Sequence, residues 1–409
     1  MNLKKDRNFL YIISANTLAN IGSGIAMIGI PWHLLNQVNG ERSLGIITFI
    51  TTGLLFILSP YLGIIIDRYS RKKLELIYNL LGFLLVFAFA LWGLFLGEYQ
   101  SYHLMILYMV GSLYFTFHFQ TMLGMTQELF AKDTYQTLNS VLEIQNQVAN
   151  VIAGGLAGIL IARWGLVNIL LVNAGTYLAA FVFYLLIKYQ KSQSINFTKK
   201  VSAIEDFKAG WKYLRQQPSL SIFYLATYIP FSIVMLINYV FPVYVRKTLH
   251  AGPVVFGLYE VIFSCGSVLA GLVIVVLTKR LGKERFIILN ATIITISMFC
   301  LPILPLASVF LVMNVMIGFG SAGVKITRRT IMMENIPTSI VGRVNSFYSI
   351  VEIALRLTFI SIFTAMISKT GTTIPLLIMG TLLLFSVFFI MYCQKGVKRE
   401  FALSNESLK

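Results

Sequence analysis

Long apolar runs separated by short polar or charged segments dominate the sequence. Each run is long enough for a helix that crosses the hydrocarbon core of a bilayer, which takes about 20 residues. The runs cover roughly residues 9–35, 44–66, 74–97, 102–126, 138–162, 165–187, 219–245, 254–278, 286–304, 307–332, 338–367 and 371–393. Membrane barrels instead show alternating strands of about ten residues. The pattern predicts an all-α integral membrane protein with twelve transmembrane helices.

The basic residues gather in every second loop. If the chain starts in the cytoplasm, most of its 33 Lys and Arg residues fall on the inner side. The residues left for the outer side are Arg42, Arg163, Arg246, Lys247 and Lys369. Cytoplasmic loops of membrane proteins carry this excess of Lys and Arg. We therefore expect a multi-pass protein of the cell (inner or plasma) membrane with both termini in the cytoplasm.

Composition supports the membrane assignment and excludes other classes. The chain is 57% hydrophobic and 12% charged, whereas a soluble chain has about 25% charged residues. The loop bias explains the formal charge of +17, so no nucleic-acid partner is expected. The 4 histidines and 3 cysteines are scattered without metal-ligand spacing. We expect no metal, no cofactor and no enzymatic activity.

The longest inner segment divides the chain into two sets of six spans. Residues 1–187 form the first predicted bundle and 219–394 the second, with a cytoplasmic tail at 395–409. The linker 188–218 contains an amphipathic pattern that begins at the capping-box pair Ser202 and Glu205 and ends at Pro218. We expect a helix lying on the inner leaflet, or one packed on soluble loops.

An internal repeat relates the two halves. The stretch "QELFAKDTYQTLNS" at 127–140 aligns with "MENIPTSIVGRVNS" at 333–346, at equivalent inner loops. The match predicts two parallel six-helix repeats, an arrangement that places a substrate site near the middle of the membrane.

Ionisable residues inside the spans are candidate functional groups. A charge at the bilayer centre costs about 2.5–3.5 kcal/mol on insertion scales. Glu143 lies on a polar face of the fifth span with Asn139, Asn146 and Asn150, and the repeat partner of this face carries Asn345, Ser349, Glu352 and Arg356. Glu352 and Arg356 have the i, i+4 spacing of an ion pair, either structural or part of a coupling site. Glu260 and Glu143 are further candidates for binding a proton or cation.

A charged segment after the second span resembles the signature loop of the major facilitator superfamily, G-x-x-x-D-R-x-G-R-[RK]. The matching residues are Gly63, Asp67, Arg68, Arg71 and Lys72. The stretches "GWKYLRQQPSL" at 210–220 and "GRVNS" at 342–346 are similar to its drug-exporter branch, which includes macrolide-efflux proteins and enterobactin exporters. Ser70 replaces the usual glycine. The fourth span has His118 where proton antiporters often have arginine, and the fifth lacks the proline of their G-P-x-x-G-G motif.

The resemblance implies a monomeric secondary transporter that works by alternating access. It would export a hydrophobic or amphipathic small molecule in exchange for a proton or cation, with the signature loop closing the inner gate. Cavity candidates are Asn16, Asn20, His118, Asn314 and Lys325, while Arg328 and Arg329 are expected to reach water at the end of the tenth span. Alternatively, His118 is a packed or hydrogen-bonded histidine with a structural role alone. Two alternative functions stay open: a permease that works with a separate ATPase, and an importer of the same fold.

Asp67 is the member of the charged segment that a basic anchor does not need. We expect Asp67→Asn to reduce transport while membrane insertion stays normal, because the gate then loses its carboxylate. Transport assays paired with surface and membrane quantification measure both effects. Unchanged transport with normal insertion would leave this loop with an anchoring role alone.

Overall fold

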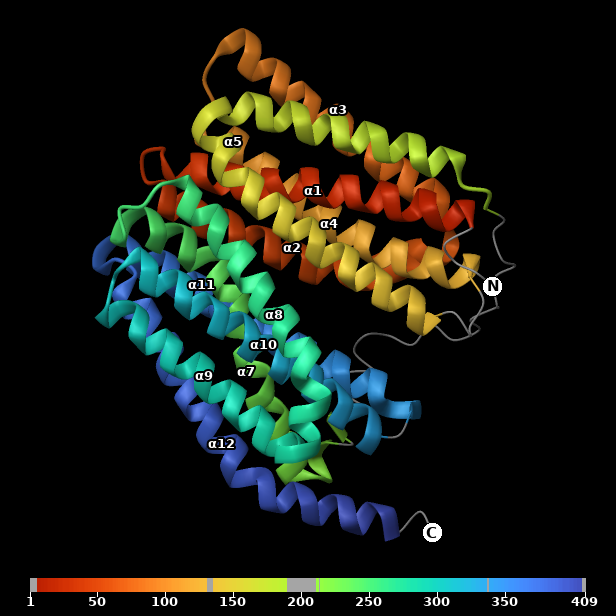
Figure 1. Ribbon diagram of the computed structural model, residues 1–409, viewed down its shortest axis with the longest axis vertical. Helices are drawn as coiled ribbons and strands as arrows, with labels where there is room; N and C mark the ends of the chain where they lie inside the picture. The colour runs from red at the N-terminus through yellow and green to blue at the C-terminus, as the bar shows by residue number, and fades with distance from the viewer. Residues whose placement is uncertain (1–5, 131–134, 190–210, 213, 337, 407–409) are drawn as a thin grey trace. The chain divides into compact units, whose positions relative to one another are not determined.

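The computed structural model describes residues 6–130, 135–189, 211–212, 214–336 and 338–406, and all regular elements in these ranges are helical (Figure 1). The helices are α1 Arg7–Leu35, α2 Gly40–Arg68, α3 Arg71–Leu96, α4 Ser101–Leu129, α5 Tyr135–Leu186, α7 Pro218–Val243, α8 Pro253–Leu281, α9 Lys283–Ile303, α10 Ala307–Asn335, α11 Thr338–Thr370 and α12 Thr373–Glu406. A short π-helix, Tyr244–Thr248, extends α7. Within the described residues, 10 segments are long and apolar enough to cross a membrane. The predicted all-α membrane fold is confirmed.

One helix contains two of the predicted spans. The 52 residues of α5 include a break at Gly165, whose backbone has φ 73° and ψ 173°. Glycine adopts positive φ without the steric penalty of a side chain. The break falls at the end of the gap expected between residues 162 and 165, so the two spans follow each other with no loop between them.

The contacts divide the chain into two compact units. Unit 1 comprises Met1–Thr198 together with Ala251–Val261, and unit 2 comprises Lys199–His250 together with Ile262–Lys409. The beginning of α8 therefore belongs to unit 1, where Gly257 lies against Gly154 and Gly158 of α5. Small residues at these positions let two helix backbones approach closely.

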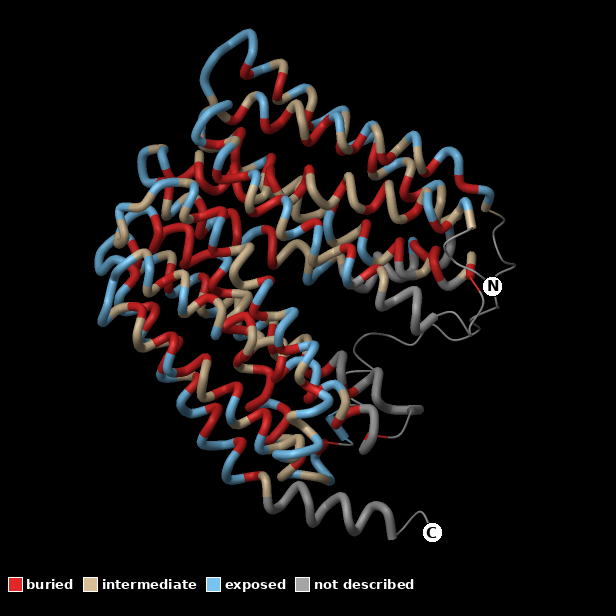
Figure 2. Tube along the Cα trace, in the orientation of Figure 1, coloured by how far each residue is buried: buried red, intermediate tan, exposed pale blue. Residues whose placement is uncertain are grey.

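In unit 1, α1 is the central helix. It packs against α5, α4 and α2, while α3 packs against α4 and α5 (Figure 1). Buried residues occur along the whole length of α1 (Figure 2), and many of them are small, including Ala15, Ala19, Gly22 and Ala26. Side chains of four helices can therefore converge on its middle.

In unit 2, α7 packs against α10, α11 and α12, and α9 packs against α10 and α12. Aromatic rings fill the space around α7: Tyr228 stacks on Tyr348 with ring centroids 5.1 Å apart, and Phe241 meets Phe310 edge to face. Between α8 and α10, Gly318 faces the backbone of Phe263. A side chain at this glycine would collide with main-chain atoms that cannot move aside.

We expect Gly318→Ala to lower the free energy of unfolding by about 1–3 kcal/mol, the usual cost of overpacking. Gly271→Ala in α8 is the matched control, because no atom lies within 4 Å of the added methyl group. Its effect should stay within about 0.5 kcal/mol. Thermal unfolding of both purified variants in detergent measures the difference, and equal stability of the two would contradict the close α8–α10 contact.

Candidate functional site

A buried carboxylate–imidazole pair lies inside unit 1. Glu75, in the second turn of α3, is 0% exposed, and His118 in the middle of α4 is 3% exposed. Nδ1 of His118 lies 2.8 Å from Oε2 of Glu75. An unpaired ion inside a protein costs several kcal/mol, so the two groups must share at least one proton or form an ion pair.

The sequence of α3 explains why Glu75 faces inward. Its buried positions begin with Leu74 and Glu75, and from Glu75 onward they recur every three or four residues, at Asn79, Gly82, Val86, Ala90 and Gly93. The other faces carry large apolar side chains such as Leu81, Leu84 and Leu85, which are exposed in the isolated protein. These leucines can contact lipid, so the narrow stripe of polar and small residues on the opposite face of α3 packs against α4 and α5.

Two amides extend the pair into α1 and α5. Nε2 of His118 lies 2.6 Å from Oδ1 of Asn16, and Nδ2 of Asn16 donates to Oε1 of Gln145. Among the described residues, Oε1 of Glu75 and Nε2 of Gln145 have no hydrogen-bond partner. The four side chains form one continuous row across α3, α4, α1 and α5, which we call the polar row.

A second contact joins α1 and α5 one turn further along α1 and at the next residue of α5. Nδ2 of Asn20 donates to Oδ1 of Asn146 at 2.7 Å. Asn20 was expected to line a cavity, and Asn146 to share a polar face with Asn150. The structure pairs Asn20 with Asn146 and leaves Asn150 exposed.

Tyrosine side chains enclose the polar row. Tyr114 stacks on the His118 ring with centroids 5.4 Å apart, and its hydroxyl donates to Oδ1 of Asn79 at 3.0 Å. Tyr177 packs against Tyr114. These rings exclude water from the pair, which strengthens its electrostatic interaction.

The basic residues of the signature loop are held within unit 1. Arg71 donates to the carbonyl oxygen of Gly124 at 2.7 Å and lies 3.0 Å from a carboxylate oxygen of Glu128. Lys72 donates to the carbonyl oxygens of Leu185 and Ile187. These contacts fasten the start of α3 to the ends of α4 and α5. The side chains of Asp67 and Arg68 lie outside the described residues, as does Glu143.

The replacement of the signature glycine by Ser70 has a local reason. Ser70 is the N-cap of α3, with φ −62° and ψ 120°, and its hydroxyl accepts a hydrogen bond from the backbone of Lys73. This backbone conformation needs no glycine, and serine is a preferred capping residue.

Glu128, the partner of Arg71 at the end of α4, also accepts a hydrogen bond from Tyr189. Burial together with this carboxylate raises the pKa of Tyr189 to about 12.

In unit 2 the structure corrects the expected position of Arg328. This residue does not reach water: it is 7% exposed, donates to the carbonyl oxygen of Thr227 at 3.0 Å and lies over the ring of Tyr228, 3.6 Å from its centroid. The tyrosine face and the carbonyl stabilise the buried guanidinium in place of water. Arg329 is exposed, as expected.

Glu352 and Arg356 lie beside each other as their spacing predicted. Nε of Arg356 is 3.6 Å from Oε1 of Glu352, which is 4% exposed. This separation is an ion pair without a hydrogen bond. Since Arg328 also interacts electrostatically with Glu352, this part of unit 2 holds two guanidinium groups around one carboxylate.

The remaining candidates lie apart from these two clusters. Glu260 accepts a hydrogen bond from its neighbour Tyr259 and lies next to Gly154 of α5 in unit 1. Asn314 is buried in unit 2 and donates to the carbonyl oxygen of Phe310. Lys325 is exposed on α10.

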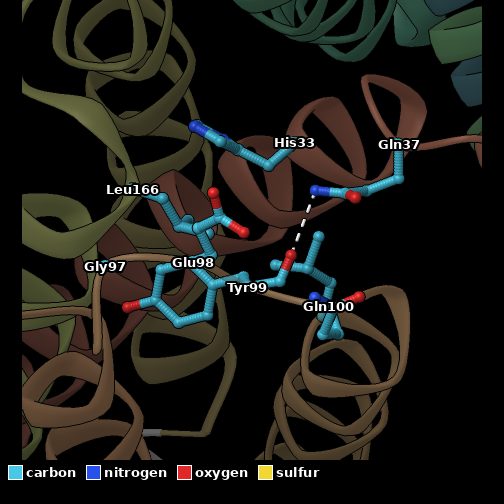
Figure 3. Close-up of a pocket in the computed structure, with 8 residues that line it drawn as sticks. His33, Gln37, Gly97, Glu98, Tyr99, Gln100 and Leu166 are labelled. Carbon is cyan, nitrogen blue, oxygen red and sulfur yellow. Dashed lines mark hydrogen bonds between the residues drawn. The ribbon is translucent and has the colours of Figure 1, made fainter.

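A separate hollow of about 390 Å³ opens in unit 1 (Figure 3). It lies between the end of α1 and the loop from α3 to α4, where Gln37 donates to the carbonyl oxygen of Tyr99 at 3.1 Å. Burial raises the pKa of Tyr99 to about 12. None of the residues expected to line a substrate cavity lies here.

Three important residues were not predicted as site residues. Glu75 was not singled out, Gln145 was outside the polar face assigned to the fifth span, and Arg328 was assigned to the membrane surface. The signal for Glu75 was available, because Asn79 follows it at helical spacing on a stripe of small residues. Gln145 carries no comparable signal, since its neighbours Asn146 and Gln147 are equally polar.

Two curated proteins that resemble the chain are both named as efflux proteins. The chain is 22% identical over 347 residues to multidrug efflux pump Tap of Mycolicibacterium fortuitum, covering 82% of this chain and 83% of that protein. It is 20% identical over 385 residues to macrolide efflux protein A of Streptococcus pyogenes, covering 92% and 93%.

Solved structures share the fold. The nucleoside transporter NupG superposes with a TM-score of 0.75 at 12% identity, covering 95% of this chain and 100% of that chain. A bacterial homologue of the iron transporter ferroportin in an inward-facing state superposes with a TM-score of 0.71 at 16% identity, covering 95% and 98%. The sequence matches the Major Facilitator Superfamily over residues 12–352. The chain therefore belongs to the Major Facilitator Superfamily and is a membrane transporter.

Proposed function

We propose that the protein is a proton-coupled exporter of a hydrophobic or amphipathic compound, with Glu75 and His118 as its proton-binding site. The observation that carries this proposal is the complete burial of a carboxylate against an imidazole inside a membrane-spanning unit. The other buried positions of α3 are leucine, asparagine, glycine, valine and alanine, so Glu75 is the ionisable side chain on the buried face of this helix.

The pair is suited to binding one proton reversibly. An ionised Glu75 beside a charged imidazole, and a neutral Glu75 beside a neutral imidazole, hold the same number of protons and no net charge. Removing one proton from either form leaves a single buried negative charge. That state is costly away from water, so proton release is favoured when the site becomes hydrated during a transport cycle.

Export of an amphipathic compound is supported by the relatives, since two of them are named as a multidrug and a macrolide efflux protein. The many basic residues of the predicted inner loops support cytoplasmic termini and a cell-membrane location. Asp67 of the signature loop is the proposed gate residue, and the protein is proposed to act as a monomer. Glu260, Glu352 and Arg356 are secondary candidates for coupling.

Efflux of a panel of dyes and antibiotics from cells expressing the chain, with and without an uncoupler, tests direction and energy source together. We expect efflux that the uncoupler abolishes. Efflux that survives the uncoupler would favour a separate ATPase, and accumulation in place of efflux would favour an importer.

Glu75→Gln should lower gradient-driven efflux at least about tenfold, because the amide cannot release a proton. Glu98→Gln is the matched control, since Glu98 is an exposed loop glutamate and its loss should leave efflux unchanged. Both variants are compared at equal membrane levels. Wild-type efflux from the Glu75 variant would remove the proposed proton site.

Glu352→Gln should reduce both efflux and stability, because Arg328 and Arg356 lose the carboxylate between them. Removing one partner from a buried ion pair costs about 3–5 kcal/mol. Thermal unfolding in detergent and efflux at equal expression measure the two effects. Glu260→Gln is assayed beside it, and full efflux in both variants would exclude these carboxylates from coupling.

A further inference from the structure

Both ring nitrogens of His118 face oxygen atoms. Nδ1 contacts the Glu75 carboxyl group and Nε2 contacts the amide oxygen of Asn16. An amide oxygen only accepts hydrogen bonds, so Nε2 must carry a hydrogen. The ring satisfies both contacts as an imidazolium beside ionised Glu75, or as a neutral ring that accepts a proton from neutral Glu75. Each is the proton-loaded form of the pair.

The hydrogen bonds of the polar row all run in one direction in this form. His118 donates to Asn16, and Asn16 donates to Gln145. The row then ends at Nε2 of Gln145, a buried donor without an acceptor among the described residues. A buried unpaired amide is unfavourable, so the row is not fully satisfied in the loaded form.

Loss of the proton reverses this direction. The proton leaves to water, Glu75 stays ionised, and the neutral ring keeps the hydrogen on Nδ1 that Glu75 accepts. The lone pair of Nε2 then faces Oδ1 of Asn16 at 2.6 Å, where two acceptors repel. Rotating the Asn16 amide by half a turn places its NH₂ group on the ring and its oxygen toward Gln145. The same rotation of Gln145 lets its unpaired NH₂ group donate.

We propose that Asn16 and Gln145 are positioning residues that carry the protonation state of the Glu75–His118 pair through α1 to α5. Two amide rotations restore both hydrogen bonds with opposite polarity. The row ends beside Asn146, whose contact with Asn20 also joins α1 to α5. The most extensive helix contact of unit 1 therefore responds to a proton bound between α3 and α4. This assignment rests on the proposed function for its role in transport.

Among the described residues, the other titratable groups around the pair are tyrosine hydroxyls. They are Tyr78 on α3, Tyr114 on α4, and Tyr177 and Tyr184 on α5. On α1 the pair meets the amide of Asn16. Tyrosine hydroxyls ordinarily ionise only near pH 10, so they keep their protons at physiological pH.

The position of hydrogens on His118 can be measured directly by NMR of the full-length protein with isotope-labelled histidine. A His118→Gln sample assigns the signal among the 4 histidines. We expect Nε2 to carry a hydrogen at low pH and to lose it as the pH rises, while Nδ1 keeps its hydrogen. A ring that keeps the Nε2 hydrogen after deprotonation would overturn the assignment. No substrate or gradient is needed, so this result is independent of whether the proposed export occurs.

Two variants test whether Asn16 and Gln145 transmit the protonation state of the pair or only hold α1 and α5 together. Asn16→Asp places acceptors alone next to Nε2 of His118, so the pH at which the ring loses its proton should rise by about one unit or more.

Gln145→Met keeps the size of the side chain but ends the polar row at Asn16. Gradient-driven efflux should fall about tenfold, while His118 still titrates. Asn168→Leu, at an exposed position of α5, is the control. An unmoved titration in Asn16→Asp, or full efflux in Gln145→Met, would overturn the relay.

Discussion

A carboxylate enclosed on all sides within a lipid-spanning bundle is the constraint on which the organisation of unit 1 depends. Glu75 cannot remain ionised there without a partner, and His118 is the ionisable group that the structure places against it. The ring is in turn fixed by Asn16, and Asn16 by Gln145. One buried charge therefore determines which faces of α3, α4, α1 and α5 meet, and it links the fold of unit 1 to proton chemistry.

Unit 2 handles buried charge in a different way. Its excess is positive, with Arg328 and Arg356 near Glu352. The ring of Tyr228 and the carbonyl oxygen of Thr227 stabilise Arg328, which the weakly hydrated guanidinium tolerates better than lysine would. Among the described residues, the buried charges of the two units differ in sign and in partner. A proton site in one unit does not imply a proton site in the other.

The sequence predicts the features that depend on local pattern. Helix spans follow from the apolar runs, the break near Gly165 from the gap between two runs, and the Glu352–Arg356 contact from the i, i+4 spacing. The Glu75–His118 contact depends on how α3 and α4 are rotated about their axes, which no local pattern states. Arg328 was misplaced for a related reason, because the position of an arginine near the end of a span does not reveal whether an aromatic ring shields it inside the unit.

The signature loop and the proposed proton site are connected through the same helix, α3. Arg71 begins α3 and holds the carbonyl oxygen of Gly124 on α4, while Glu75 lies one turn further along α3 and meets His118 less than two turns before Gly124. Two attachments so close together fix both the sliding and the rotation of α3 against α4. The basic residues of the loop therefore help to set the geometry in which a carboxylate and an imidazole can share a proton. A change at the proposed gate that shifted α3 would alter that geometry directly, so the proposed gate and the proposed proton site belong to one connected element.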